Sequence, residues 1–311
     1  MSDRRGFLAL LVLLGAGWGA TQPLTKTAVS TGHGPAGLIF WQLVIGALLL
    51  GAVQALRRRP LPLHPGALRV YLVIALIGTL LPNSASYLAA RHLPAGVMSV
   101  AIATVPMMAF PMALLLRTDR FGWGRAAGLA LGLAGVVLIA APQGAVPGAV
   151  SGAGTALWLT VALVAPFFYA VEGNYVARWG TAGCGPVEVL LGASILGACL
   201  ALPLALVSGQ WIDPRAGIGR PEAALIAGAS IHALAYVGYV WLIGRAGAVF
   251  AAQVSYLVTG FGVVWSMAFL AERYSGWVWL AMAAMMAGLF LVQPRPRDPL
   301  AAPVGAAKDA V

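Results

Sequence analysis

Residues 92–96 (HLPAG) recur in related form as residues 245–249 (RAGAV), 153 positions further along the chain. Each stretch separates two long apolar runs. Because the two copies stand at equivalent places in the two halves of the chain, they indicate an internal duplication in which each half is one structural repeat.

Other segments keep the same order in both halves. Four further pairs recur at offsets of 151 or 153: Trp18-Gly19 with Tyr169-Ala170, Gly34-Pro35 with Gly185-Pro186, 119–121 (DRF) with 272–274 (ERY), and 134–139 (AGVVLI) with 287–292 (AGLFLV). Each repeat holds about five apolar spans, and an odd number forces the two copies into opposite orientations across a bilayer. We therefore expect a first repeat over 1–146, a second, inverted repeat over 147–293 and a disordered cytoplasmic tail over 294–311.

The composition places most of the chain in lipid, because 60% of its 311 residues are hydrophobic and only 9% are charged. A β-barrel is disfavoured, since its strands are short and alternate in polarity, whereas the apolar runs here are long and continuous. The sequence predicts an all-α integral membrane protein whose ten transmembrane helices form two inverted five-helix repeats around a central cavity. The predicted spans are 7–29, 36–56, 68–89, 94–116, 123–141, 155–177, 187–208, 221–243, 249–270 and 276–293.

The basic residues predict the orientation of these helices. If the N-terminus is cytoplasmic, that side carries fourteen basic residues and the opposite side four. The fourteen are Arg4, Arg5, Arg57, Arg58, Arg59, Arg69, Arg117, Arg120, Arg125, Arg178, Arg245, Arg295, Arg297 and Lys308, and the four are Arg91, Arg215, Arg220 and Arg273. Short cytoplasmic loops are rich in Lys and Arg, so we expect a multi-pass protein of a bacterial-type plasma (inner) membrane with both termini in the cytoplasm. The cluster 57–59 is placed to contact anionic lipid head groups.

Several other classes of protein are disfavoured by the sequence. The net charge of +10 is scattered over short loops with no domain to present it, so no nucleic-acid partner is expected. Cys184 and Cys199 are too few for a disulfide framework or a metal site, and no cofactor is predicted. Residues 4–16 resemble a signal peptide, but we interpret them as part of a retained first helix. A membrane-embedded enzyme is only a remote alternative, because the four histidines of the chain are dispersed and match no catalytic motif.

Three sets of residues carry a resemblance to a known family. They are Trp18-Gly19 with Lys26 further along the first span, the stretch 92–96 followed by Pro106, and Glu272-Arg273 at the end of the ninth span. In this order the chain resembles the ten-helix EamA-type members of the drug/metabolite transporter superfamily, from about residue 7 to 293. Three positions depart from the family pattern: Gln42 stands where an arginine is frequent, Thr259 where the second repeat usually has proline, and Ala271 where glycine is usual.

The resemblance implies a secondary transporter that works by alternating access. It implies that helices 3, 4, 8 and 9 line a central cavity and that helices 1, 2, 6 and 7 form its movable walls. Within the superfamily, the residues are most similar to those of exporters of aromatic and other neutral amino acids. We therefore expect a monomeric exporter of amino acid-like small molecules, with multidrug or other metabolite efflux, proton-coupled or not, as the alternative.

Polar side chains at bilayer depth are the candidates for substrate binding, because they are costly there unless they face a cavity or another helix. Aromatic walls with amide and hydroxyl groups suit a zwitterion with an apolar side chain. The alternative is that they only bond to neighbouring helices. The candidates are Trp18, Gln22, Gln42, Asn83, Tyr87, Thr104, His232, Tyr236, Tyr239, Gln253 and Tyr256.

Four residues are candidates for gating or coupling. Lys26 either attracts a substrate carboxylate at the outer mouth or reaches the external interface, with equal weight. Glu172 is the only carboxylate well inside a span; it either couples transport to protons or, as we favour, bonds near the cytoplasmic interface to 174, 175 or 178. Pro106 and Pro166 each remove a backbone hydrogen bond and are hinge candidates.

Small residues recur every four positions in two of the predicted helices. Gly124, Gly128 and Gly132 lie in the fifth span, and Ala284 and Gly288 in the tenth. This spacing lets helices approach closely. It predicts packing between these two spans, or a seam between two copies of the chain.

Overall fold

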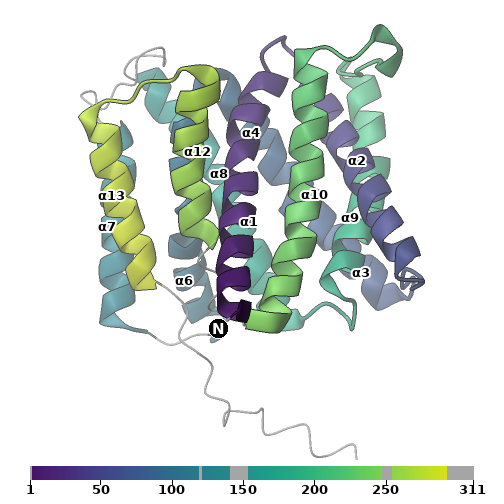
Figure 1. Ribbon diagram of the computed structural model, residues 1–311, viewed down its shortest axis with the longest axis horizontal. Helices are drawn as coiled ribbons and strands as arrows, with labels where there is room; N and C mark the ends of the chain where they lie inside the picture. Colours follow the sequence, from purple (N-terminus) through teal and green to yellow (C-terminus); the bar gives the residue numbers. More distant parts are fainter. Residues whose placement is uncertain (1, 119–120, 141–152, 247–253, 293–311) are drawn as a thin grey trace, which may run out of the picture.

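The computed structural model describes residues 2–118, 121–140, 153–246 and 254–292. Within these residues the chain is helical apart from short connections, and it contains no β-strand (Figure 1). The helices are α1 (Ser2–Ala28), α2 (Pro35–Leu56), α3 (Pro65–Ile74) continued by the π-helix η1 (Ala75–Leu80) and α4 (Leu81–His92), α5 (Ala95–Ile102), α6 (Val105–Leu115), α7 (Trp123–Ala140), α8 (Ala153–Trp179), α9 (Pro186–Val207), α10 (Arg220–Ala246), α12 (Val254–Leu270) and α13 (Gly276–Val292).

These helices confirm the predicted all-α membrane fold. The segments α3 to α4 and α5 to α6 each correspond to one predicted span, so the described residues supply a helix for each of the ten. Six segments are long and apolar enough to cross a bilayer: Arg5–Ala28, Pro35–Leu56, Pro65–His92, Ala95–Leu115, Ala156–Trp179 and Pro186–Val207. Shorter apolar helices occur in α7, α12 and α13. Large apolar side chains such as Leu13, Leu48 and Phe290 are exposed on the outside, as expected for a multi-pass membrane protein.

The helix ends follow from local sequence. Pro35, Pro65 and Pro186 each stand at the start of a helix, where the missing N–H of proline costs nothing. In α9, the carboxylate of Glu188 accepts the backbone N–H of Gly185 at 2.7 Å. The two Gly-Pro pairs of the internal repeat therefore have the same structural role, since each begins the second helix of its half.

The helices of the two halves pack reciprocally. Helix α1 packs against α10 and α12, and α8, which starts the second half, packs against α4 and α6. Helix α2 pairs with α9 and α7 with α13, and α2 also contacts α10 as α9 contacts α3. Exchanging each helix with its counterpart in the other half therefore reproduces these main contacts. Helices α13, α12, α1 and α10 stand next to one another along the long axis of the molecule (Figure 1).

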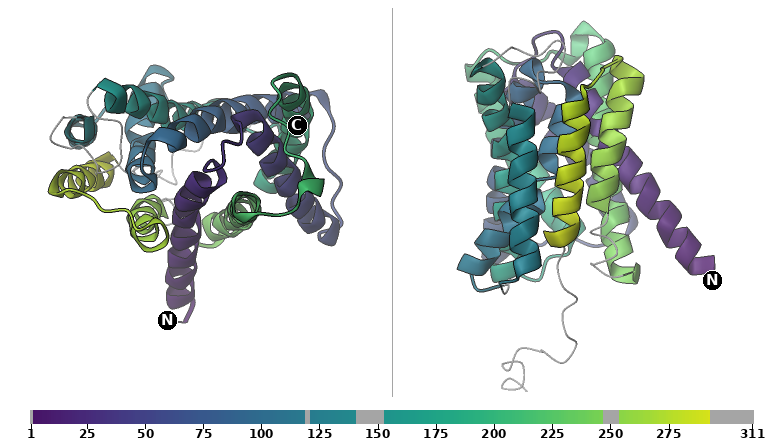
Figure 2. Two further views of the ribbon diagram at one scale, coloured as in Figure 1. Left: turned by 90° about the horizontal axis from the view of Figure 1, so that it is seen from above. Right: turned by 90° about the vertical axis from the view of Figure 1, so that its left-hand side faces the viewer.

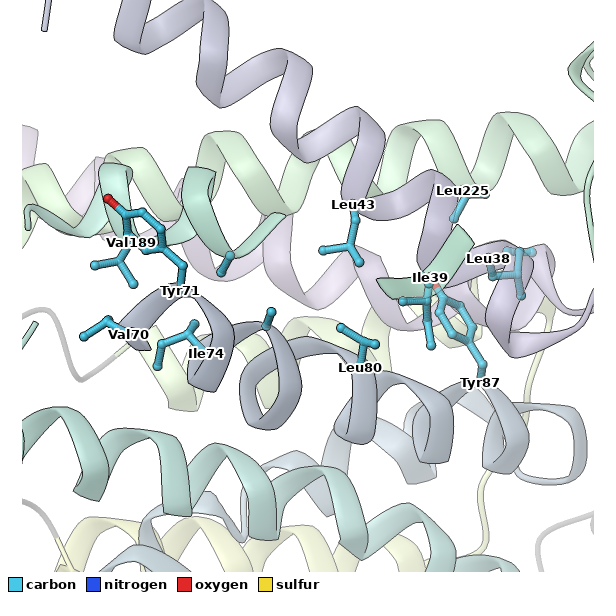
Figure 3. Packing of buried hydrophobic residues seen from close by; sticks show 14 of the residues in the cluster. Leu38, Ile39, Leu43, Val70, Tyr71, Ile74, Leu80, Tyr87, Val189 and Leu225 are labelled. Carbon is cyan, nitrogen blue, oxygen red and sulfur yellow. The ribbon is translucent and has the colours of Figure 1, made fainter. Parts of the chain in front are cut away.

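The connections define two ends of the molecule. The N-terminus of α1 lies at one end, and the turns that join α9 to α10 and α12 to α13 lie at the other, which we call the distal end (Figures 1 and 2). Helix α10 therefore starts from the distal end, whereas α1 starts from the N-terminal end. A large apolar cluster packs α3 and α4 against α2 and α9, with Tyr71, Leu43 and Val189 in it (Figure 3).

The glycines in α7 and α13 let the two backbones touch. A Cβ at Gly288 would lie 2.6 Å from the carbonyl oxygen of Gly128 and 3.1 Å from the nitrogen of Gly132. The sequence allowed either packing between these two helices or a seam between two copies of the chain, and the structure shows packing between the two helices.

Replacing Gly288 by alanine is expected to destabilise the protein by about 1–3 kcal/mol, because the added methyl group meets backbone atoms that cannot rotate away. The measurement is thermal unfolding in detergent micelles. Gly260→Ala in α12 is the matched control, since a Cβ there meets nothing within 4 Å. Equal unfolding temperatures for the two variants would contradict the close packing.

Candidate functional site

A cavity of about 110 Å³ lies between helices of both halves. Its walls come from α1, α2, the segment from η1 to α4, the end of α5, α8 and α10. The lining residues are Thr21, Gln22, Leu24, Thr25, Ala28, Gln42, Gly78, Thr79, Asn83, Ser86, Tyr87, Ile102, Tyr169, Ala224, Leu225, Gly228, Ala229 and His232. A smaller cavity of about 30 Å³ shares four of these residues and extends along α2 and α9.

Hydrogen bonds connect three helices across one wall of the cavity. The side-chain oxygen of Gln42 in α2 accepts from Tyr87 Oη at 2.7 Å and from Asn83 Nδ2 at 3.2 Å, both in α4. Tyr169 in α8 donates to Asn83 Oδ1 at 3.1 Å. The amide of Asn83 thus joins the first half of the chain to the second.

Aromatic side chains lie beside the cavity, next to the lining residue His232. Trp18 of α1 packs edge-on against Tyr239 of α10, with ring centroids 5.4 Å apart, and against the His232 ring at 6.2 Å. The Nε1 of Trp18 is buried and has no hydrogen-bond partner among the described residues. A buried donor without a partner is uncommon in folded proteins. Trp18 and Tyr169 hold equivalent places in the two repeats. In the first half this position supplies an aromatic contact, and in the second half it supplies a hydrogen bond.

A local irregularity in the third span shapes the inner wall. Pro82 has no N–H to give to the carbonyl of Gly78, and the helix widens into the π-helix η1 at this place. A Cβ at Gly78 would lie 2.9 Å from Cδ of Glu172 in α8. The glycine therefore leaves room for this carboxyl group directly behind the cavity wall.

The link between α4 and α5 is held from two sides at the distal end. Lys26 Nζ donates to the carbonyl oxygens of Leu93 at 2.9 Å and Arg91 at 3.4 Å. Glu272 accepts the backbone N–H groups of Ala95 at 2.9 Å and Gly96 at 3.2 Å. A cation at the end of α4 and a carboxylate at the start of α5 both complement the helix dipoles.

Tyr274 completes this arrangement. Its hydroxyl accepts the N–H of Gly96 at 3.0 Å and donates to Glu272. Burial, together with the bond to Glu272, raises the pKa of Tyr274 above its ordinary value, so the hydroxyl keeps the proton that it donates.

Replacing Glu272 by alanine is expected to cost about 1–2 kcal/mol of stability, because the N–H of Ala95 and the hydroxyl of Tyr274 lose their acceptor and Gly96 loses one of its two. The readout is again thermal unfolding in micelles. Asp213→Ala is the comparison, since Asp213 bonds only to Arg215 in an exposed loop, and it should change the stability little. If both variants unfold alike, the capping role of Glu272 is wrong.

Five of the eleven substrate-binding candidates line the cavity: Gln22, Gln42, Asn83, Tyr87 and His232. Trp18 and Tyr239 pack beside His232, and Tyr236 lies within electrostatic range of Glu172. Thr104 is buried away from the cavity, where its hydroxyl bonds to Ala101 at 2.7 Å. Gln253 lies outside the described residues, and Tyr256 belongs to α12 but its side chain lies outside the description.

The gating candidates are placed as follows. Pro106 stands in the first turn of α6, just after the break that separates α5 from α6. Pro166 lies inside α8. Lys26 bonds to the α4–α5 link, and Glu172 faces Gly78. The expected partner at position 174 bonds instead to the carbonyls of Ala109 and Ala170.

The helices that line the cavity also differ from those implied by the resemblance. Helix α1 contributes five residues, as many as α10, and the described part of α12 contributes none. The candidate list left out Thr21, Thr25, Thr79, Ser86 and Tyr169. The repeat contained a signal for Tyr169, since it aligns with Trp18.

A bundle of apolar helices that encloses a polar cavity between two duplicated halves is the architecture of a membrane transporter. Comparison with protein families agrees with this class. The chain matches the EamA-like transporter family over residues 6–141 and 156–293, and it belongs to that family.

Two individual relatives add to this. The chain is 25% identical over 292 residues to a "Probable terminal-alkyne amino-acid exporter" of Streptantibioticus cattleyicolor, covering 92% of each chain. A solved crystal structure shares the fold, with a TM-score of 0.59 at 19% sequence identity, over 90% of this chain and 94% of the other.

Proposed function

We propose that this protein exports neutral amino acids, aromatic ones among them, from the cytoplasm as a secondary transporter. The observation that carries the proposal is the chemistry of the cavity. Among the described residues that line it, every polar side chain is a hydroxyl, an amide or an imidazole, and none is a lysine, arginine, aspartate or glutamate. Such a wall suits a small molecule without net charge that forms several hydrogen bonds.

The relative's description supports the substrate class, since it is that of a probable amino-acid exporter. The aromatic group of Trp18, His232 and Tyr239 favours an apolar or aromatic side chain on the substrate. Multidrug efflux and the transport of other metabolites are the alternatives to be distinguished by experiment.

Alternating access between two inverted repeats, 1–146 and 147–293, is the proposed mechanism. The reciprocal packing supports it, because the main helix pairs of one half have counterparts in the other. The break at Pro106 and the proline in α8 supply flexible points, as the wall helices must pivot. We further propose that both termini and the tail 294–311 face the cytoplasm of a bacterial-type inner membrane, and that the monomer is the working unit.

The test is uptake of labelled amino acids into sealed vesicles that contain the purified protein. We expect saturable uptake of neutral and aromatic amino acids, reduced by an excess of the unlabelled compound, and none of nucleotide sugars. Vesicles without protein are the control. If the vesicles take up none of the labelled amino acids, the proposed substrate class is wrong. If an imposed pH gradient leaves the uptake unchanged, proton coupling is excluded.

A second candidate function is efflux of organic cations. The observation that favours it is Glu172, a carboxyl group close behind the cavity wall. Labelled organic cations in the same vesicles separate the two candidates, because a cation exporter would carry them and leave neutral amino acids behind.

A further inference from the structure

Glu172 lies where three helices meet next to the cavity. Its carboxyl group contacts Gly78 in η1 and interacts electrostatically with the hydroxyls of Tyr169, on its own helix, and Tyr236 in α10. Gly78 and Tyr169 both line the cavity. The carboxyl group is therefore separated from the cavity only by a glycine without a side chain and by a tyrosine.

No internal partner accounts for this carboxyl group. Among the described residues, Glu172 forms no hydrogen bond and no ion pair, and burial is the one influence on it that the structure resolves. The nearby amide of Asn174 is used by two backbone carbonyls, so it does not turn toward the glutamate. A charged carboxylate away from water is costly unless it is paired with an opposite charge.

Gln42, in another helix of the cavity lining, offers donors. Two of the three hydrogen bonds within the wall are accepted by the side-chain oxygen of Gln42, and its two N–H groups have no partner among the described residues, which leaves them for a ligand. Gln42 and Gly78 line the same cavity. A zwitterion can then place its carboxylate against an amide and its amino group toward the carboxylate of Glu172.

We infer that Glu172 is the group that binds the protonated amino group of the transported molecule. The inference rests on the proposed function and narrows it: the preferred ligands are primary ammonium compounds, analogues without an amino group bind more weakly and without help from Glu172, and N-acylated analogues are rejected. The missing side chain at Gly78 is what gives the ammonium group access to the carboxylate.

The test is binding of four related probes to the purified protein in lipid nanodiscs, measured by calorimetry. They are phenylalanine, phenethylamine, which lacks the carboxylate, phenyllactate, which lacks the amino group, and N-acetylphenylalanine. In the native protein we expect the first two to bind and the last to fail. Glu172→Gln should weaken the binding of phenylalanine and phenethylamine at least about tenfold, the effect of losing roughly 1.4 kcal/mol, and leave the binding of phenyllactate unchanged.

A second variant keeps the charge and changes its position. Gly78→Ala places a methyl group about 3 Å from the carboxyl group and should weaken the same two probes by a smaller factor. Glu188→Gln is the matched control, because this glutamate caps α9 and bonds to Gln54, away from the cavity lining. Should Glu172→Gln fail to fold, Gly78→Ala and Glu172→Asp carry the test.

The outcomes separate the two claims. If Glu172→Gln binds all probes like the native protein, or loses phenyllactate equally, the inference is wrong even when amino acids are transported. If amines bind in a Glu172-dependent way but vesicles carry no amino acid, the inference stands and the proposed substrate falls.

Discussion

Asn83→Leu is expected to lower amino-acid transport by about tenfold to a hundredfold while the protein still inserts and folds. The amide of Asn83 donates to Gln42 and accepts from Tyr169, so leucine removes both bonds, leaves the Tyr169 hydroxyl without its acceptor and leaves the Gln42 oxygen with Tyr87 alone. Each unpaired buried group costs about 1–3 kcal/mol. The loss falls on transport because this wall is where the substrate is expected to bind. The measurement is the initial rate of uptake into vesicles, normalised to the amount of inserted protein.

Two other variants make this result interpretable. Tyr87→Phe removes only one bond to Gln42 and should reduce the rate less than Asn83→Leu. Thr160→Ala removes a hydroxyl on the exposed side of α8, bonded only to the carbonyl of Ala156, and should transport normally. A normal rate for Asn83→Leu would show that this wall does not contact the substrate.

Filling the cavity is expected to have an effect of similar size. Gly228 lines the cavity in α10, and a Cβ there would lie 3.7 Å from Cβ of Leu24, an ordinary contact. Gly228→Ala should therefore fold and transport nearly like the native protein. Gly228→Phe extends a ring into the space for the substrate and should reduce uptake roughly tenfold or more, the effect of about 1.4 kcal/mol or more of lost binding.

The graded series distinguishes a blocked site from a damaged fold. Thermal unfolding of the phenylalanine variant should stay within a few degrees of the native protein, since its ring occupies space that is otherwise empty. Uptake that persists in Gly228→Phe would mean that the substrate follows another path through the molecule.

The fold could be predicted from the sequence because its determinants are local. Long apolar runs set the spans, and prolines such as Pro35 and Pro186 set where helices begin. The duplication and the family are likewise visible in short segments, and the match to the EamA-like transporter family confirms the latter. Boundaries differ by only a few residues, as at α1, which starts at Ser2 where position 7 was expected.

The site was less predictable because it depends on pairs that are distant in sequence. The bond between Tyr169 and Asn83 joins residues 86 positions apart, and the glutamate that caps α5 comes from 177 positions away. Polarity at bilayer depth identified Gln42 and Asn83, but it gives no rank among polar residues, so Thr104 was included and Thr21 was not. The position of Glu172 depends on the widened turn at η1, which no periodicity indicates.

The short link between α4 and α5 connects parts of the molecule that move against each other in the proposed mechanism. Lys26, at the end of α1, holds its first residues, and Glu272, in the turn between α12 and α13, holds the next ones. A tilt of α1 would therefore displace the peptide groups next to those that bind the α12–α13 turn. In the proposed mechanism the link therefore couples the two halves of the chain at this end, so that neither half moves independently of the other.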